Sequence, residues 1–458
     1  MSGNDIIAAV ATAWGTSAIA IVRMSGEGSV VIADTFFRGA RPLSNEPARR
    51  MVLGVIADGE IAVDEILAVR FDRGASYTGE ESVELHCHGG ISAAGRCLDL
   101  LMRAGARAAL PGEFTKRAFL SGRIDLAQAE AVSGVIMARS EAELASASRS
   151  LQGELSSGLK ELSDSLTALR AEIEARIDFP DDVGEDEYVG YSQSLATLSA
   201  KTQFLLERCR VGLTLRNGVR IAIVGRPNVG KSSLMNALLE RNRAIVTDIP
   251  GTTRDTLDAE LIHKGLAITL VDTAGMRELS SGTPPDFIES MGVERSRETI
   301  RGADFCLLVI DASSPITNED EYACLEALVR PTILTMNKSD LPVAKGNEFE
   351  NLGRFVGRVK TSALIGDGIN DLKDALAEVA LGSLSPSDGM MATERMIGAL
   401  ESARLCVDDA REAIDKSLGA DAAGSLLAEA ADFFAEISGA NASEELLDAI
   451  FDTFCIGK

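Results

Sequence analysis

A glycine-rich stretch in the middle of the 458-residue chain, Gly225 to Ser233, carries the residue types best suited to phosphate chemistry. It reads GRPNVGKSS, which fits the pattern G-x-x-x-x-G-K-[S/T], and the apolar run 220–224 precedes it as a strand would. In such a loop main-chain N–H groups surround a β-phosphate, Lys231 reaches the β- and γ-phosphate oxygens, and Ser232 ligates Mg²⁺. The stretch therefore predicts a nucleotide-binding loop, with contacts from Asn228, Val229, Gly230, Lys231, Ser232 and Ser233.

Two further stretches supply groups that a GTPase needs around the γ-phosphate. The run TDIPGTT, residues 247–253, offers the Thr253 hydroxyl to close over Mg²⁺ and the γ-phosphate. Asp272 ends the apolar run 268–271 and would hold the magnesium shell, while the N–H of Gly275 would sense the γ-phosphate. Together with Lys231, which we expect to act in catalysis as well as in binding, they predict hydrolysis of the nucleotide.

The last stretch in the series, Asn337 to Asp340, reads NKSD and selects the base. The Asp340 carboxylate can accept hydrogen bonds from guanine N1–H and the exocyclic amine, whereas adenine offers no donor pair there. The ordered series therefore predicts a guanine nucleotide, GTP or GDP, with Mg²⁺. Beyond the glycine-rich loop, the expected nucleotide contacts are Thr247, Thr252, Thr253, Asp272, Thr273, Ala274, Gly275, Asn337, Lys338, Asp340, Ser362 and Ala363.

Composition limits the compartment and the partners. The chain has 45 Lys and Arg against 69 Asp and Glu, a formal net charge of −24, so an RNA partner must meet a local basic patch or be held by another protein. We expect no DNA partner. Seven scattered cysteines without a C-x-x-C pair predict reduced thiols in a cytoplasmic protein. Because Asn4 and Asp5 lie in the first ten residues, we expect no signal peptide, and no apolar run approaches a membrane span.

The patterning predicts a multidomain chain of mixed α+β and α/β architecture. Residues 1–120 mix strand-like runs, such as Ser82 to His88, with helical ones, such as Ile91 to Met102, and predict an α+β domain. Across residues 214–382 the two kinds of run alternate, which predicts a Ras-like, doubly wound P-loop domain with a mostly parallel sheet covered on both faces. Its expected strands are 220–224, 268–271, 305–310, 333–336 and 355–359.

A third, helical domain is expected on both sides of the nucleotide domain. Leucines and isoleucines fall three or four apart from Leu151 to Ile177, which predicts one long helix that stops before Pro180. A second helix is expected over about 192–210. Two helices cannot by themselves bury this row of leucines and isoleucines. Helical patterns return after residue 385 and could supply the missing helices. We therefore expect a discontinuous helical domain, residues 121–213 and 383–458, with the nucleotide domain inserted between its parts.

Several motifs outside the nucleotide domain support a family assignment over essentially the full length. They are SYTGE at 76–80, HGG at 88–90, PGEFT at 111–115, LAQAEA at 126–131, IDFPD at 177–181 and FCIGK at 454–458. In these motifs the chain resembles the MnmE (TrmE) family of GTPases that help to modify the wobble uridine of certain tRNAs. The resemblance implies a homodimer formed through a folate-binding N-terminal domain, and a flavoprotein partner, MnmG (GidA). The reaction would add an aminomethyl-type group at C5 of the uridine.

The resemblance also implies a potassium ion in the place of an arginine finger. The side chain of Asn228 matches one ligand, and the main-chain carbonyls of Thr247, Ile249 and Thr252 match the others. An ordinary turn residue is the alternative for Asn228. Hydrolysis of GTP would then drive dimerisation of the nucleotide domains.

The water-orienting residue is assigned by the same resemblance. Met276 stands where Ras-like enzymes place a glutamine, and methionine cannot orient water. Glu289 matches the family's catalytic glutamate. Extra residues at 281–286 leave Glu278 and Glu294 as alternatives, and a solvated helix-face acid is the other interpretation of Glu289.

Four residues match the family's site for 5-formyl- or 5,10-methylene-tetrahydrofolate: Arg23, Glu84, Arg123 and Lys458. Glu84 could accept two parallel bonds from the pterin, and arginines could hold the glutamyl tail. A member of the family has lysine where this chain has Arg123, so the contact geometry at this position need not be the same. Cys455 is either a reactive thiol near the folate carbon or a buried thiol without chemistry.

Two classes of function remain open from the sequence. The first is a potassium-activated GTPase that takes part in tRNA chemistry with a flavoprotein. The second is a regulatory switch or ribosome-assembly factor that signals through its nucleotide domain alone. The second class usually carries a basic RNA-binding appendage, which this acidic chain does not show, and it would leave the folate positions unexplained.

Overall fold

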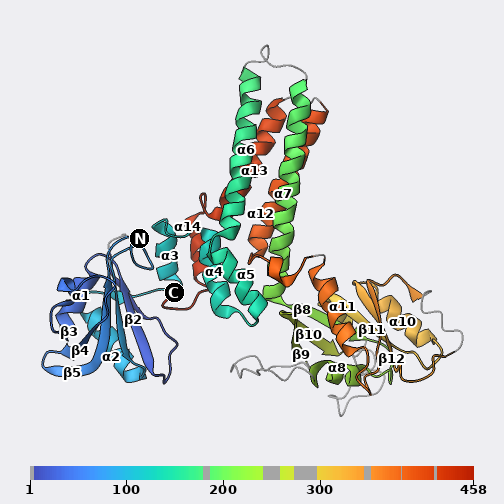
Figure 1. Cartoon of the computed structure of the whole chain (residues 1–458), viewed down its shortest axis with the longest axis horizontal. Coiled ribbons are helices and arrows are strands. Elements are labelled where there is room, and N and C mark those ends of the chain that lie inside the picture. The colour runs from blue at the N-terminus through green and yellow to red at the C-terminus, as the bar shows by residue number, and fades with distance from the viewer. Residues whose placement is uncertain are drawn as a thin grey trace. The chain divides into compact units, whose positions relative to one another are not determined.

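The computed structural model describes residues 5–178, 186–240, 258–272, 297–344, 352–382, 384–416 and 420–458 (Figure 1). The chain divides into two compact units. Unit 1 contains Met1–Ile136, Ser150–Thr202 and Gly398–Lys458, and unit 2 contains Met137–Arg149 and Gln203–Ile397.

Unit 1 contains a seven-stranded sheet in the order β3-β4-β5-β6-β2-β1-β7. Its described strands are β1 (Ile7–Val10), β2 (Ile19–Ser25), β3 (Phe37–Gly39), β4 (Val52–Asp58), β5 (Ile61–Phe71), β6 (Ser82–His88) and β7 (Arg107–Ala108). All pairs are antiparallel except β1 with β7. Alternate residues of β2, such as Val22 and Met24, pack in one core with α1 (Ser29–Phe36) and α2 (Ile91–Arg103), so Arg23 lies on the opposite face.

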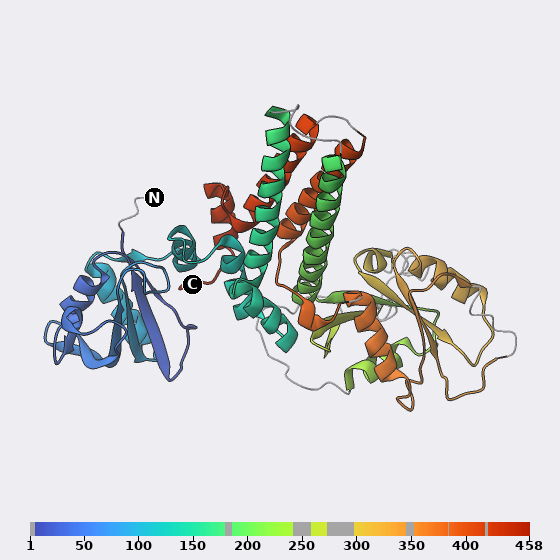
Figure 2. The same ribbon diagram turned by 45° about the horizontal axis from the view of Figure 1, so that its top comes forward.

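The rest of unit 1 is helical. The short helices are α3 (Glu113–Leu120), α4 (Leu126–Met137) and α14 (Glu444–Phe451), and Phe451 packs with Leu126 and Leu447. The long helices α6 (Glu154–Asp178) and α13 (Ala420–Ser438) run side by side in both views (Figures 1 and 2). Within unit 1, Ser199 of α7 (Asp186–Asn217) donates a 2.6 Å hydrogen bond to Asp408 of α12 (Glu394–Asp415). Helical segments from both parts of the sequence therefore share this unit.

The predicted single helix from residue 151 to 177 is wrong at its start. Leu151 ends a separate helix, α5 (Glu141–Leu151), and α6 begins only at Glu154. Gly153 lies between them with φ of +89°, a left-handed conformation that interrupts a helix. The apolar spacing continues across this break, so the pattern alone could not detect it.

Unit 2 contains a six-stranded sheet in the order β13-β12-β11-β8-β10-β9. Its described strands are β8 (Val219–Val224), β9 (Asp258–His263), β10 (Leu266–Asp272), β11 (Phe305–Asp311), β12 (Thr332–Asn337) and β13 (Gly357–Lys360). Helices α8 (Lys231–Glu240) and α11 (Ile369–Leu381) pack on one face and α10 (Asn318–Ala327) on the other. The expected mostly parallel sheet with two covered faces is confirmed. The unexpected element is β9, an antiparallel edge strand joined to β10 by a turn with positive φ at Lys264 and Gly265.

Two helical glycines, one in each unit, provide a matched test of helix packing. A Cβ at Gly212 of α7 would lie 1.7 Å from the carbonyl oxygen of Met390, whereas a Cβ at Gly398 of α12 would meet no atom within 4 Å. We expect Gly212→Ala to destabilise the protein by about 2 kcal/mol or more through overpacking, and Gly398→Ala to stabilise it by about 0.5–1 kcal/mol. Urea transitions followed by circular dichroism measure both. Equal transitions for the two variants would contradict the close approach at Gly212.

Candidate functional site

The glycine-rich loop joins the end of β8 to the start of α8. A Cβ at Gly225 would lie 2.4 Å from the carbonyl oxygen of Val309, and one at Gly230 would lie 2.5 Å from Nδ2 of Asn337, so both positions require glycine. Asn228 between them has φ of +64°, a conformation that asparagine tolerates. The Lys231 ammonium donates to the carbonyl oxygens of Gly225 at 2.8 Å and Arg226 at 2.9 Å. The loop is thus built as a tight turn with its lysine folded over it.

The described part of the predicted magnesium site is assembled. The hydroxyl of Ser232, in the first turn of α8, donates a 3.1 Å hydrogen bond to the carboxylate of Asp272 at the end of β10. Since β8 and β10 are parallel neighbours, their carboxyl ends meet at one sheet edge and bring these side chains together. Hydroxyl and carboxylate oxygens are ligands and outer-shell partners that suit Mg²⁺.

The amide of Asn337 ties three stretches into one site. Its Nδ2 donates to the carbonyl oxygen of Val229 at 2.9 Å, and its Oδ1 accepts the N–H of Ala363 at 3.1 Å. Next to it, the hydroxyl of Ser362 donates to Asp340 at 2.5 Å and so orients the carboxylate predicted to read guanine. The glycine-rich loop, the NKSD stretch and the 362–363 turn therefore form a single site.

Asp311, at the end of β11, was not among the predicted site residues. Its carboxylate accepts hydrogen bonds from the Lys338 ammonium at 2.7 Å and from the Ser313 hydroxyl at 2.6 Å, and Lys338 also donates to the carbonyl oxygen of Asn228 at 3.1 Å. Burial alone would raise the pKa of Asp311, but these hydrogen bonds and the lysine charge outweigh it and lower the pKa to about 2. The sequence did contain a signal for Asp311, because it is an acid that directly follows a buried apolar run, as Asp272 does.

Some predicted residues fall outside the part of the chain that the structure describes. The predicted ligands, catalytic residues and alternatives in this group are Thr247, Ile249, Thr252, Thr253, Thr273, Ala274, Gly275, Glu278, Glu289 and Glu294. Their assignments stay predictions.

A second cluster lies in unit 1, on the sheet face opposite α1 and α2. Arg23 of β2 stands directly across from Glu84 of β6, and its Nε and Nη2 lie 2.9 and 2.8 Å from Oε1 of Glu84. The guanidinium carbons of Arg23 and Arg123 each lie 5.2 Å from the ring centroid of Tyr77, and Arg123 also donates to the Tyr77 carbonyl oxygen. Sequence reasoning missed Tyr77 as a contact, although it lies in the SYTGE motif.

The last residues of the sequence join this cluster. The N–H of Phe114 donates to the carbonyl oxygen of Lys458 at 3.2 Å, and the Arg23 guanidinium carbon lies 5.7 Å from the Phe114 ring centroid. Burial lowers the pKa of Lys458, and the nearby charge of Arg23 lowers it further, against the opposing effects of Cys455 and Glu84. The Cys455 side chain is exposed, so its interpretation as a buried thiol is wrong. The structure brings all four predicted folate residues to one place.

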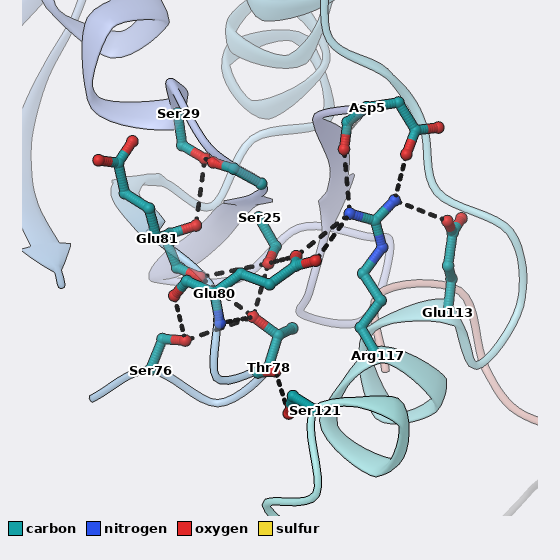
Figure 3. A network of polar contacts seen from close by, with 12 residues as sticks. Asp5, Ser25, Ser29, Ser76, Thr78, Glu80, Glu81, Glu113, Arg117 and Ser121 are labelled. Carbon is teal, nitrogen blue, oxygen red and sulfur yellow. Dashed lines mark hydrogen bonds and ion pairs between the residues drawn. The ribbon is translucent and has the colours of Figure 1, made fainter. Parts of the chain in front are cut away.

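Arg117 of α3 lies at the centre of another charged network in unit 1 (Figure 3). Its guanidinium forms salt bridges with Asp5 at 2.8 Å, Glu80 at 3.1 Å and Glu113 at 3.1 Å. Burial raises the pKa of Glu113, but its bonds with Arg107, the Leu110 N–H and Arg117 outweigh burial and lower that pKa. This network joins the SYTGE and PGEFT motifs.

A cavity of about 970 Å³ lies beside the network. Its lining includes the four cations Arg73, Lys116, Arg117 and Arg123 and nine acids, among them Glu444. Arg123 therefore belongs to both the cavity and the Tyr77 cluster.

Within the described residues, no helix combines the length and the apolar character needed to cross a membrane.

Comparisons with known proteins find relatives over nearly the full chain. A family model described as the MnmE helical domain matches residues 126–455, and one described as the GTP-binding protein TrmE N-terminus matches residues 6–123. The chain is 42% identical to a tRNA modification GTPase MnmE of Moorella thermoacetica, over 99% of this chain and 100% of that one. It is 38% identical to the protein of that name from Clostridioides difficile, over 99% of each. A solved G domain of the T. maritima FeoB iron transporter is 30% identical over 35% of this chain and 98% of that one, with a TM-score of 0.25.

The Asp311–Lys338 pair predicts a pH-dependent contribution to stability. Because the pKa of Asp311 is depressed, its carboxylate stabilises the folded state above the unfolded pKa near 4, and this contribution is lost as the pH falls toward about 2. We expect Asp311→Asn to lower the free energy of unfolding by about 2 kcal/mol at pH 7, with the difference from wild type shrinking only below about pH 4.

Urea unfolding between pH 7 and pH 2.5 measures this difference. Glu378→Gln, which removes an exposed acid of α11, is the charge-matched control and should have almost no effect. An Asp311→Asn difference that is equally small, or that does not change with pH, would contradict the assignment.

Proposed function

The chain belongs to the MnmE family of tRNA modification GTPases, and from that premise we propose that GTP hydrolysis by this chain drives a modification at C5 of the wobble uridine of certain tRNAs. The chain is a GTP hydrolase that acts in tRNA modification. The observation that carries the proposal is that one chain contains two assembled clusters of different chemistry. Asn337 joins the nucleotide-binding stretches in unit 2, and Arg23 and Glu84 form the centre of a charged cluster in unit 1.

In unit 2 we assign the phosphates to the glycine-rich loop and the start of α8. The N-terminus of a helix presents free N–H groups and a positive dipole end, which favour an anion. On nucleotide binding, the Lys231 ammonium would exchange the carbonyl oxygens of Gly225 and Arg226 for the β- and γ-phosphate oxygens. Ser232 would hold Mg²⁺ directly, with Asp272 in its outer shell, and the ion supplies charge neutralisation at the transferring phosphoryl group.

Guanine selection is assigned to the pair Asp340 and Ser362. The Ser362 hydroxyl already holds one carboxylate oxygen of Asp340, which fixes its orientation toward a planar pair of donors. Asn337 fixes the 362–363 turn by accepting the Ala363 N–H. A base whose edge offers acceptors in place of these donors would leave the Asp340 charge unpaired, at a cost of a few kcal/mol.

The proposal keeps potassium as the second cation. Asn228 lies in the loop with φ of +64°, and its side chain is assigned as a ligand, together with carbonyl oxygens of Thr247, Ile249 and Thr252 that lie beyond the described residues. The potassium charge would stabilise the transition state, and Glu289 would orient the attacking water. Closure of this region would drive dimerisation of the nucleotide domains.

Potassium dependence is the test of the Asn228 assignment. We expect GTP turnover at least about tenfold faster in KCl than in NaCl, because the ion replaces a transition-state charge. Asn228→Gly removes the side chain without strain at positive φ and should abolish the difference, whereas Asn236→Ala on the exposed side of α8 should retain it. Equal wild-type turnover in the two salts would refute the assignment.

In unit 1 we propose a site for 5-formyl- or 5,10-methylene-tetrahydrofolate at the Arg23–Glu84 cluster. Two features of the cluster fit such a ligand. The buried Nε2 of His86, 3.5 Å from Oε2 of Glu84, has no hydrogen-bond partner among the described residues, so a polar ligand edge can pair there. Lys458 is half-buried near Arg23 with a lowered pKa, and a carboxylate such as that of a glutamyl tail would compensate both charges.

The remaining folate contacts are assigned to Arg123 and Cys455. Arg123 contacts Tyr77 through its guanidinium group. In this proposal it also binds the glutamyl tail of the ligand. The exposed thiol of Cys455 is assigned as nucleophile or base at the one-carbon group. When bound, the folate supplies the carbon that is transferred to the uridine.

We also propose a homodimer formed by the same sheet face and a complex with the flavoprotein MnmG. Leu53, Leu67, His86 and Ile21 stand in one row across β4, β5, β6 and β2, and Leu53 and Leu67 are 62% and 41% exposed. This row lies on the Arg23–Glu84 face because side chains alternate along a strand. Exposed leucines beside a ligand cluster favour burial by a second copy. Action on tRNA implies a cytoplasmic location for the proposed reaction.

Mass spectrometry of tRNA nucleosides tests the function. Cells that lack the protein should lose the aminomethyl-type group from wobble uridines, and wild-type protein should restore it. Glu84→Gln should fail to restore it while GTP turnover stays unchanged, because Glu84 lies in unit 1 and the nucleotide stretches in unit 2. Unaltered nucleosides in the deletion strain would overturn the proposal and favour the regulatory switch.

A further inference from the structure

We propose that five exposed arginines of unit 1 form the surface that binds the phosphate backbone of tRNA. They are Arg38, Arg41, Arg49, Arg50 and Arg73, and are called the arginine edge below. The proposal rests on the proposed function, because it identifies the surface that would hold the tRNA during that reaction. A chain with a formal net charge of −24 repels RNA over most of its surface, so phosphate contact requires a local positive patch.

The arginine edge differs from most other described cations of unit 1, Arg123 and Lys458 excepted, in its lack of acidic partners. In the parts of the long helices that belong to unit 1, every Lys or Arg whose side chain is described forms a salt bridge, as Lys160 does with Asp164. Within the described residues, none of the five edge arginines has an acidic partner. An unpaired guanidinium keeps its full charge and its fork of donors for a phosphate.

Strand register places most of the edge at one end of the sheet. Val52 opens β4 opposite Ala68 of β5, and just before it the N–H of Arg49 donates to the carbonyl oxygen of Arg70 at 2.8 Å. The guanidinium of Arg49 donates to the carbonyl oxygen of Ala75 at 3.1 Å. Arg49, its neighbour Arg50 and the loop that contains Arg73 therefore lie together.

The β3–β4 connection brings the remaining two arginines toward this end. β3 runs antiparallel to β4 with Gly39 opposite Gly54, so the chain leaves β3 in the direction of the β4 start, and Arg41 follows two residues later. Arg38 lies within β3, where its guanidinium donates to carbonyl oxygens near the end of α1 at Asp34 and Thr35. Residues 37–50 carry four arginines and a single acid, Glu46.

Three acids lie near the edge, Asp34, Glu46 and Asp72, and within the described residues none of them forms a salt bridge with an edge arginine; the carboxylate of Asp34 accepts the N–H groups of Leu43 and Ser44. Glu46 is the sole acid of the 37–50 segment, and its carbonyl oxygen accepts a hydrogen bond from Arg70. Asp72 is paired with Arg70, which is not a member of the edge. The edge arginines are therefore left as a local positive surface.

The edge also adjoins the proposed reaction site. Arg73 and Arg123 both line the cavity of about 970 Å³, and Arg123 contacts Tyr77 in the folate cluster. Phosphates held at Arg49, Arg50 and Arg73 would therefore place neighbouring nucleotides close to the cluster. An acidic protein would meet the same charge, but the chain belongs to a family that acts in tRNA modification, which favours RNA as the partner.

Salt-dependent tRNA binding tests the proposal. The probe is a fluorescently labelled tRNA with uridine at the wobble position, titrated with the full-length chain from 50 to 200 mM KCl. The test variant R41Q/R49Q/R50Q/R73Q omits Arg38, because its guanidinium also caps α1. The control R96Q/R103Q/K160Q/R170Q removes four cations of unit 1 that are paired with acids.

We expect the test variant to bind tRNA at least about tenfold more weakly at 50 mM KCl. The magnitude of its slope of log affinity against log salt should fall by about 3 to 3.6, since each of the four lost phosphate contacts contributes about 0.7–0.9 to that slope. The control should retain most of the wild-type affinity and slope. Circular dichroism verifies that each variant is folded, and both should hydrolyse GTP at the wild-type rate.

Three results would overturn the proposal. They are equal losses in the two variants, no tRNA binding by the wild-type chain at 50 mM KCl, and a test variant that binds tRNA normally but no longer associates with the flavoprotein. The last result would make the edge a protein-docking surface. Failure of the proposed function is distinguished separately, because it would appear as unaltered wobble nucleosides in the deletion strain whatever the binding data show.

Discussion

The packing of the last residues of the sequence against the first strand is the constraint on which unit 1 depends. Gly457 has φ of +93°, and a Cβ there would lie 2.6 Å from the carbonyl oxygen of Val10, so only glycine permits this approach. With the backbone held there, the Phe114 N–H reaches the Lys458 carbonyl oxygen. β1, α3 and the chain end thus form one packed piece, and Lys458 is kept beside Arg23.

Unit 2 depends on a comparable contact between distant segments. The Asn337 amide joins the glycine-rich loop at Val229 to the turn at Ala363, and Gly230 is required because the amide occupies the space of a side chain. The neighbouring residue Lys338 donates to Asp311 and so connects these segments to the end of β11 as well. Both sites are therefore assembled by a few polar contacts between segments that are far apart in the sequence, on elements whose own packing is apolar.

Local patterns in the sequence predicted the elements better than these contacts. The strand Ser82–His88 and the nucleotide-domain strands ending at Asp272 and Asn337 follow from short apolar or alternating runs with a clear end. The break at Gly153 and the edge strand β9 were missed, because one depends on a single backbone angle and the other on pairing with β10. Asp311 and Tyr77 were missed for the same reason, since their partners come from other elements. The gathering of Arg23, Glu84, Arg123 and Lys458 was expected only through family resemblance.

The central claim is that the chain end closes a ligand site on the unit 1 sheet, and folate binding by the full-length chain tests it most directly. Isothermal titration with 5-formyl-tetrahydrofolate should show one site per chain for the wild type. Lys458→Ala should weaken folate binding at least about tenfold, because it removes one charge-assisted contact. GTP turnover should be unchanged. No binding by the wild type, or equal binding by the two proteins, would contradict the claim.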